Sequence, residues 1–261
     1  MRRGPNNAEA IVLGAIDYGE SDRILTFYTE EFGKLKAIAK GARRSRKRFV
    51  GALDAPARVR GVFYSNGPDA LLRVDSAMLL EGFCRTKTGV LRYAEACCLV
   101  ELVSETTREG QATPGIYGLL LDFLRLMEAG GLEVSPRFFE MKLLGLAGYL
   151  PHLEGCVVCR RRFDGTEGAR VYFLSDKGGA VCGRCNGADA GPSVSASTCR
   201  MLDAATRLDT GKLARLRPAA SFEREAGEIL DGFIRHQLGK ELKTKRFLAA
   251  MRDADTGRDA V

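Results

Sequence analysis

The stretch "AIVLGAIDYGESDRILTFYTEEFGKLKAIAKGARR", residues 10–44, decides how the N-terminal part of the chain folds. It contains three short segments rich in β-branched and aromatic residues, and the turn sequences "DYGESD" and "EEFG" separate them. Two similar segments follow, "RVRGVFY" at 58–64 and "ALLRV" at 70–74, with an Asn-Gly step between them. Five short strands in about 70 residues are typical of a small barrel, and the OB-fold is a common nucleic-acid-binding barrel of that size. We therefore predict an OB-fold β-barrel over residues 1–80.

Positive charge is concentrated in and after the third predicted strand. The chain has a formal net charge of +7, yet residues 34–60 alone carry ten Lys and Arg against one acid. In "KLKAIAK" the period-2 rule places the lysines on one face and Leu35, Ala37 and Ala39 on the other. Charge of one sign gathered locally favours a polyanionic partner over the alternative, a solvated loop. The predicted phosphate contacts are Lys34, Lys36, Lys40, Arg43, Arg44, Arg46, Lys47 and Arg48.

Other residues could add to such an interface. Tyr28, Phe49 and Tyr64 either stack on bases or fill the barrel core, and the sequence leaves both open. Near the C-terminus, residues 235–252 carry six Lys and Arg against one acid. This second basic stretch also contains large apolar residues, so it is either a docking site for an acidic segment or an ordinary amphipathic helix surface.

After the predicted barrel, the spacing between apolar residues becomes that of an α-helix. Leu91, Ala94, Cys98 and Leu102 recur at helical spacing, and similar stripes continue to residue 150 and return after 194. We predict a helical domain over 81–150 and 194–250, with helix starts at Thr113-Pro114 and Ser135-Pro136. The segment 251–261 has no apolar face and is expected to be disordered. The predicted core cysteines of the helices are Cys84, Cys97, Cys98 and Cys199.

Two CxxC pairs stand between these helical parts. They are Cys156 with Cys159 and Cys182 with Cys185, and 22 residues separate the pairs. A disulfide framework is disfavoured because the N-terminus lacks the apolar segment of a secretory signal, so we expect a cytoplasmic chain with reduced thiols. A redox dithiol usually begins a helix, whereas these pairs flank a predicted hairpin. We predict one structural Zn²⁺ per chain, held by the four thiolates in an insertion over 151–193, with a dithiol switch as the alternative.

Several arginines lie beside these cysteine pairs and could offset the charge of a metal–thiolate cluster. Four thiolates around Zn²⁺ leave two negative charges. We expect nearby guanidinium groups to offset that charge and to keep the thiols deprotonated. The four candidates are Arg160, Arg161, Arg162 and Arg184.

Catalytic motifs are missing from the sequence. It contains two histidines, neither near an acid–nucleophile pair, and it has no P-loop, dinucleotide fingerprint or zinc-protease motif. No apolar run approaches the roughly 18 residues that span a bilayer. We therefore predict a binding protein that is neither an enzyme nor a membrane protein, and the overall class is α+β.

Three blocks of the sequence resemble one family. The stretch 10–44 resembles the OB-fold signature of the bacterial DNA repair and recombination protein RecO family. "RFFEMKLLGLAGYLPHLEGCVVC" resembles its central helix and zinc segment, and "FIRHQLGKELKTKRFL" resembles its C-terminal helices. The resemblance covers residues 8–250. One departure is Arg160, where members often have glycine directly after the second cysteine.

The resemblance implies a function in recombinational repair. Members bind single- and double-stranded DNA, anneal complementary strands and join RecR. With RecR they help load RecA onto DNA coated by single-strand-binding protein, whose C-terminal tail they contact. It also implies a cytoplasmic, nucleoid-associated protein. Without the resemblance, the residues indicate only a nucleic-acid-binding OB-fold with a zinc-stabilised helical domain. The alternative function is an RNA-binding OB-fold and zinc factor in transcription or translation, and a pure assembly adaptor without DNA affinity is a third class.

Overall fold

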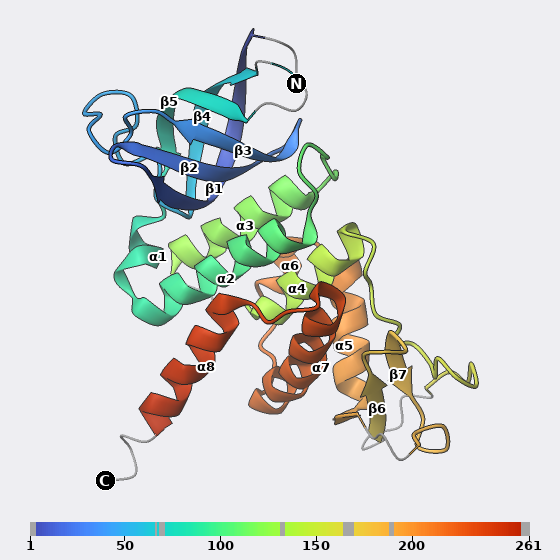
Figure 1. Cartoon of the computed structure of the whole chain (residues 1–261). Helices are drawn as coiled ribbons and strands as arrows, with labels where there is room; N and C mark the ends of the chain where they lie inside the picture. Colours follow the sequence, from blue (N-terminus) through green and yellow to red (C-terminus); the bar gives the residue numbers. More distant parts are fainter. Residues whose placement is uncertain are drawn as a thin grey trace. The chain divides into compact units, whose positions relative to one another are not determined.

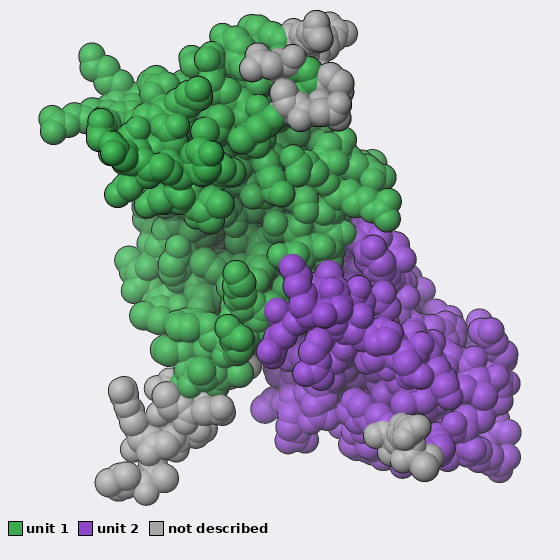
Figure 2. Space-filling view, in the orientation of Figure 1, with its two compact units in different colours: residues 1–131, 242–261 green, residues 132–241 purple. Residues whose placement is uncertain are grey.

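A computed structural model describes residues 4–65, 67, 71–130, 134–163, 170–187 and 191–256. An N-terminal barrel precedes helices and a small three-stranded sheet, which confirms the predicted α+β class (Figure 1). The chain divides into two compact units, residues 1–131 with 242–261 and residues 132–241 (Figure 2). This division differs from the predicted domain limits at 80, 150 and 193, and those limits stay a prediction.

Five strands form a closed barrel in the first unit, with the neighbour order β1-β2-β3-β5-β4. The strands are β1 (Gly4–Tyr18), β2 (Asp22–Thr29), β3 (Gly33–Ala39), β4 (Ala57–Ser65) and β5 (Leu72–Glu81). β3 and β5 pair in parallel and the other neighbours are antiparallel. Leu35, Ala37 and Ala39 are buried while Lys36 is exposed, because successive side chains of a strand point to opposite faces. The alternation predicted for "KLKAIAK" is therefore confirmed within β3.

The loop after β3 is anchored in the barrel core. Ala42, Phe49, Ala52 and Leu53 are buried in the same apolar cluster as the inward-facing residues of the strands. Burying these side chains fixes a loop whose remaining residues are mostly basic, since each fully buried large apolar side chain contributes about 1.5–3 kcal/mol. The fold thus holds a dense cationic segment at a defined place on the barrel.

Four helices complete the first unit. They are α1 (Cys84–Thr88), α2 (Val90–Thr106), α3 (Ile116–Ala129) and α8 (Lys243–Thr256). α3 begins two residues later than the predicted Thr113-Pro114 start, because Gly115 adopts the left-handed conformation (φ 87°) that ends the preceding turn. α2 packs against α8, whose first backbone N–H groups donate to the carboxylate of Glu101.

Helix α8 corrects one expectation. It continues to Thr256, so residues 251–256 are helical although the sequence predicts disorder from 251 onward. The Glu101 carboxylate satisfies the free N–H groups of the first turn, and a nucleated helix propagates at little further cost. Residues 257–261 lie outside the described part of the chain.

The second unit combines a three-stranded sheet with helices. Its elements are α4 (Pro136–Leu146), β6 (Arg170–Leu174), β7 (Gly179–Val181), β8 (Ser193–Ser195), α5 (Ala196–Arg207), α6 (Thr210–Leu213) and α7 (Ala220–Leu238). The strand order is β7-β6-β8. Ser135 accepts a hydrogen bond from the Arg137 N–H, which confirms the predicted start of α4. Phe173 of the sheet meets Phe233 of α7 edge to face, with ring centroids 5.7 Å apart.

A buried carboxylate joins this sheet to the helices. Glu225 on α7 accepts hydrogen bonds from the Ser195 N–H (3.0 Å), the Ser195 hydroxyl (2.7 Å) and the Thr198 hydroxyl (2.6 Å). Its other oxygen accepts from Arg170 on β6 at 2.7 Å. Burial would raise the pKa of Glu225, but these hydrogen bonds and the Arg170 charge outweigh it and lower the pKa to about 2.

The four cysteines predicted to lie in the helical core differ in their burial. Cys98 and Cys199 are buried as predicted, and Cys97 is half-buried. Cys84 is exposed, so its prediction as a core residue is wrong. It is the first residue of the short helix α1, which buries only Thr86. A single short turn is too brief to show an apolar stripe in the sequence.

Candidate nucleic-acid interface and metal site

The eight predicted phosphate contacts do not share one environment. Lys34 is half-buried, and its ammonium group donates to the carbonyl oxygens of Ser104 and Thr107. Those carbonyls lie at the C-terminal end of α2, where a helix presents unsatisfied acceptors and negative partial charge. The structure therefore gives Lys34 a stabilising role at this helix end, which the prediction of a phosphate contact did not foresee.

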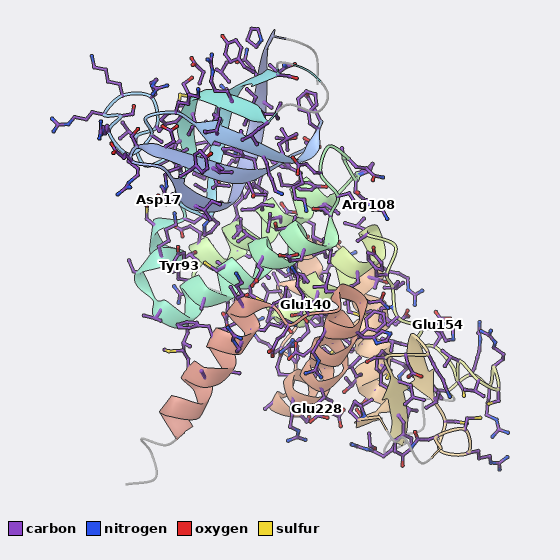
Figure 3. The ribbon with its side chains drawn as sticks, in the orientation of Figure 1. Asp17, Tyr93, Arg108, Glu140, Glu154 and Glu228 are labelled. Atoms are coloured by element: carbon purple, nitrogen blue, oxygen red, sulfur yellow. The ribbon has the colours of Figure 1, made fainter. Side chains whose placement is uncertain are left out.

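Three of the eight side chains form exposed ion pairs. Lys36 lies 3.5 Å from Glu109, and Arg44 lies 3.6 Å from Glu20. Arg43 lies 3.7 Å from Asp17, the residue labelled beside the barrel in Figure 3. Solvent-exposed pairs of this kind contribute about 0–1 kcal/mol. A phosphate can therefore replace these carboxylates at little cost.

Arg48 shapes the loop that carries the remaining charges. Its guanidinium donates to the carbonyl oxygens of Lys40 (2.6 Å) and Asp75 (3.3 Å) and lies 5.0 Å from the ring centre of Phe49. Within the described residues, the side chains of Lys40, Arg46 and Lys47 are exposed and form no hydrogen bond or ion pair. These three are the most available cations of the segment, which we name the basic loop (residues 40–48).

The aromatic candidates of the sequence are mostly core residues. Tyr28 is 1% exposed, and its hydroxyl accepts a hydrogen bond from the Thr113 N–H. Phe49 is buried in the barrel cluster, and the half-buried ring of Tyr64 is covered by the Arg73 guanidinium at 4.9 Å. The exposed aromatic residue here is Tyr18, 57% exposed at the end of β1, which sequence reasoning missed. The sequence feature that could have indicated its exposure is its position at the turn "DYGESD", where β1 ends and its last residues are exposed.

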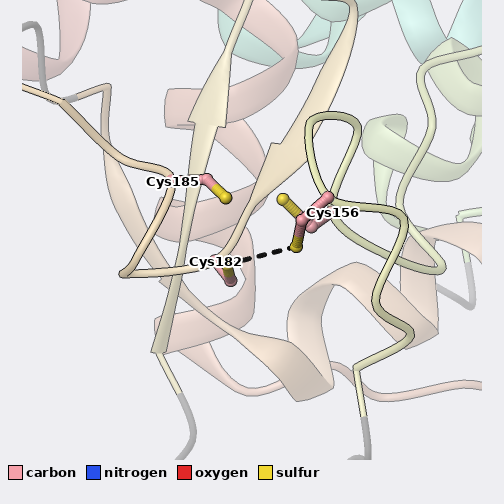
Figure 4. A group of neighbouring side chains, drawn as sticks. Cys156, Cys182 and Cys185 are labelled. Atoms are coloured by element: carbon pink, nitrogen blue, oxygen red, sulfur yellow. Dashed lines mark hydrogen bonds between the residues drawn. The ribbon is translucent and has the colours of Figure 1, made fainter.

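The four predicted metal ligands do converge. The sulfur atoms of Cys156, Cys159, Cys182 and Cys185 all lie within 4.8 Å of one another. Figure 4 shows the side chains of Cys156, Cys182 and Cys185 gathered at one place. The sulfurs of Cys159 and Cys182 lie 3.8 Å apart. A tetrahedron with metal–sulfur bonds of about 2.3 Å has edges of about 3.8 Å. The cluster is therefore the right size for a tetrahedral thiolate site.

Two backbone turns, the knuckles, hold the thiols. In the first knuckle the Cys156 N–H donates to the Arg161 carbonyl, and the Arg160 N–H donates to the Cys156 carbonyl. Arg160 adopts a left-handed conformation (φ 63°) that favours glycine, so its place after the second cysteine is strained. In the second knuckle the N–H groups of Cys185 and Asn186 both donate to the Cys182 carbonyl.

The surroundings of the four thiols give them different acidities. Burial raises the pKa of Cys156, but N–H groups of Cys159 and Cys182 outweigh it and lower the pKa to about 6. Hydrogen bonding among the thiols raises the pKa of Cys185 to about 12. Four thiolates this close repel one another, so they ionise together only around a cation.

The expected partnership between the arginines and the thiolates stays a prediction, and the largest influences on the thiols come from other groups. Burial raises the pKa of Cys156 and of Cys182, and the groups that lower it are N–H groups of the backbone and neighbouring thiols. Arg184 contributes through its backbone N–H. The backbone donors come from both knuckles, since N–H groups of Cys159 and Cys182 both lower the pKa of Cys156.

Comparison with known proteins gives the family. The family description "Recombination protein O N terminal" matches residues 1–83, and "Recombination protein O C terminal" matches residues 89–246. The "DNA repair protein RecO" of Syntrophus aciditrophicus is 35% identical over 250 residues, which cover 94% of this chain and 96% of the relative. The proteins of that name from Myxococcus xanthus (36%; 92% and 96% covered) and Anaeromyxobacter dehalogenans strain 2CP-C (37%; 91% and 93% covered) are similar along nearly their whole length.

Fold and site together define a class, an OB-fold barrel followed by helices and a four-cysteine hairpin. The matches cover both the barrel and the helical part of the chain. The chain belongs to the recombination protein O family of DNA repair proteins. Among the described residues, no helix is long and apolar enough to cross a membrane.

Proposed function

We propose that the chain is a recombination mediator that binds DNA and catalyses no reaction of its own. In this proposal it binds single- and double-stranded DNA, anneals complementary strands and acts in the cytoplasm, associated with the nucleoid. With RecR it helps load RecA onto DNA coated by single-strand-binding protein. Membership of a DNA repair family supports the process, and the exposed charges of the barrel support the contact with DNA.

The exposed cations of the basic loop are the main observation that supports a contact with DNA. Its cations project from a segment whose apolar residues are fixed in the barrel core (Figure 3). Lys40, Arg46 and Lys47 are free for phosphates, while Arg43 and Arg44 hold only exposed carboxylates. Such a surface follows a phosphate backbone without reading base edges, so its binding is sensitive to salt and tolerant of sequence. Lys36 at the edge of this surface is a further candidate.

The tetracysteine cluster holds a structural zinc ion in this proposal. Four thiolates fill the tetrahedral coordination of Zn²⁺ and leave no open position for a substrate. Zinc supplies the central positive charge that the thiols lack, and it ties the two knuckles together. The residues of this chain position the sulfurs and donate backbone hydrogen bonds to them.

The C-terminal basic stretch is the proposed contact for the tail of single-strand-binding protein. Within the first unit, α8 carries Lys243, Lys245 and Arg246, and Phe247 beside them is 48% exposed. An acidic peptide with an apolar end needs both kinds of contact. Binding of a labelled tail peptide at low salt tests this, and no binding to the full chain would refute it.

An RNA-binding function in transcription or translation is the second candidate, since a salt-sensitive phosphate surface also suits RNA. The deciding experiment is strand annealing on DNA coated with single-strand-binding protein, with and without RecR. We expect the chain to accelerate annealing, and RecR to be needed for loading RecA. Tighter binding to single-stranded RNA than to DNA, together with no annealing, would favour the alternative.

A further inference from the structure

Four arginines on the cysteine knuckles have no partner in the described part of the chain. They are Arg160, Arg161, Arg162 and Arg184, named here the knuckle arginines. All four are exposed, and none forms an ion pair or side-chain hydrogen bond with a described residue.

The metal site gathers these arginines at one end of the hairpin. Arg160 follows Cys159 directly and Arg184 precedes Cys185, and the sulfurs of those two cysteines lie within 4.8 Å of each other. Side chains ending in nitrogen project into solvent from this part of the second unit (Figure 3). Val158, at the turn of the first knuckle, is 50% exposed beside them.

Local charge at this end is positive even with the thiolates counted. A zinc ion with four thiolates carries two negative charges, against four guanidinium groups. The nearest described carboxylate along the chain, Glu154, lies 3.4 Å from Arg207 and is therefore engaged. Asp164 and Glu167 follow in the sequence but lie outside the described residues.

We infer that the knuckle arginines form a second nucleic-acid-binding surface, which contacts phosphate oxygens and is separate from the basic loop. Guanidinium groups bind phosphate through two parallel hydrogen bonds, and arginine is less strongly hydrated than lysine. The knuckle turns hold the arginine backbones in place, so fewer degrees of freedom are lost on binding. Val158 offers an apolar contact to a sugar or an unstacked base. Nothing in this set reads a base edge, so binding here is independent of sequence.

This inference rests on the proposed function and deepens it. Annealing requires a protein to hold two strands whose phosphates repel each other. The basic loop belongs to the first unit and the knuckle arginines belong to the second. Two phosphate surfaces in one chain allow each surface to hold one strand.

The test replaces three knuckle arginines in the full, zinc-loaded chain: Arg161→Gln, Arg162→Gln and Arg184→Gln. Arg160 is left unchanged because its left-handed backbone would add a separate effect on stability. The matched control, Arg200→Gln, Arg215→Gln and Arg224→Gln, removes the same charge from exposed positions of the same unit. Zinc content and melting temperature are measured first, so that a loss of fold is recognised.

Binding to oligothymidylate is then measured against salt concentration. We expect the slope of log affinity against log salt to flatten by about two units in the knuckle variant, since each phosphate contact to a single strand contributes about 0.7. The control should keep the wild-type slope, and annealing should slow only in the knuckle variant. A folded, zinc-replete knuckle variant with the wild-type slope would overturn the inference.

Two comparisons separate this inference from the proposed function. If a basic-loop variant flattens the slope and the knuckle variant does not, the inference fails and the proposed function stands. If the wild-type chain shows no salt-dependent binding to DNA, the proposed function itself fails. Binding of an acidic peptide that the knuckle variant loses, with DNA binding unchanged, would make the surface a protein-docking site and also overturn the inference.

Discussion

Replacing Glu225 by glutamine should destabilise the chain by about 3 kcal/mol at neutral pH. The carboxylate accepts hydrogen bonds from Ser195, Thr198 and Arg170, so an amide in its place turns one accepting oxygen into a donor. Either the Arg170 charge or the Ser195 N–H then lacks its acceptor. A charge-assisted hydrogen bond contributes about 1.5–3 kcal/mol, and leaving a buried partner unsatisfied costs a similar amount.

The lowered pKa of Glu225 gives a similar contribution to the free energy of unfolding, and it also sets the pH range over which that contribution is lost. The folded-state pKa is about 2, against an ordinary value of 4.5 for a glutamate. At about 1.36 kcal/mol for each pKa unit, the ionised carboxylate contributes about 3 kcal/mol. Because the folded pKa is depressed, this stability is fully present above pH 4.5 and is lost as the pH falls toward 2. A glutamine side chain at this position does not titrate, so the two proteins should converge in acid.

Urea denaturation followed by circular dichroism at several pH values tests this. We expect Glu225→Gln to lower the free energy of unfolding by about 3 kcal/mol at about pH 7 and by much less near pH 3. The matched control is Glu228→Gln, an exposed residue of the same helix that is labelled in Figure 3. Equal stability of Glu225→Gln and wild type at neutral pH, or a difference that persists to the lowest pH, would refute the reasoning.

The remaining predictions concern Arg160, the thiol cluster and Lys34. Arg160→Gly should raise the stability by about 1 kcal/mol, measured as a higher melting temperature, because glycine removes the left-handed strain at φ 63°. Arg160→Ala should give no such gain. Metal analysis should find close to one zinc per chain, and Cys182→Ser should lose the metal and lower the melting temperature; zinc-free protein prepared without chelator would contradict this. Lys34→Met should lower the melting temperature while leaving the salt dependence of DNA binding unchanged, since Lys34 serves the end of α2.

Local patterns in the sequence predicted the barrel and the thiol cluster well. The alternation in "KLKAIAK" gives the inward and outward faces of β3, because the side-chain period of a strand is fixed at two. The CxxC spacing brings two thiols of one turn together regardless of the surrounding fold. Ser135 before Pro136 gives the start of α4 for the same reason, since capping is a local interaction.

Interactions between distant segments could not be predicted in this way. Lys34 meets carbonyls that lie 70 and 73 residues further along the chain, and no local pattern encodes that approach. Tyr28 lies outside the barrel cluster, and its hydroxyl meets Thr113, 85 residues further along. Phe49 is buried because the loop after β3 packs into the barrel core. Glu101 likewise caps a helix that begins 142 residues further along, which is why the extent of α8 was missed.

Binding of the DNA phosphate backbone by the basic loop is the central claim. The most direct measurement is the slope of log affinity against log salt for single-stranded DNA, in wild type and in the variant Arg44→Gln, Arg46→Gln, Lys47→Gln. Three lost phosphate contacts should flatten the slope by about two units, nearly equally for all sequences. Zinc content and melting temperature should stay unchanged, because all three side chains are exposed. A variant that keeps the wild-type slope, or loses affinity for one sequence only, would contradict the claim.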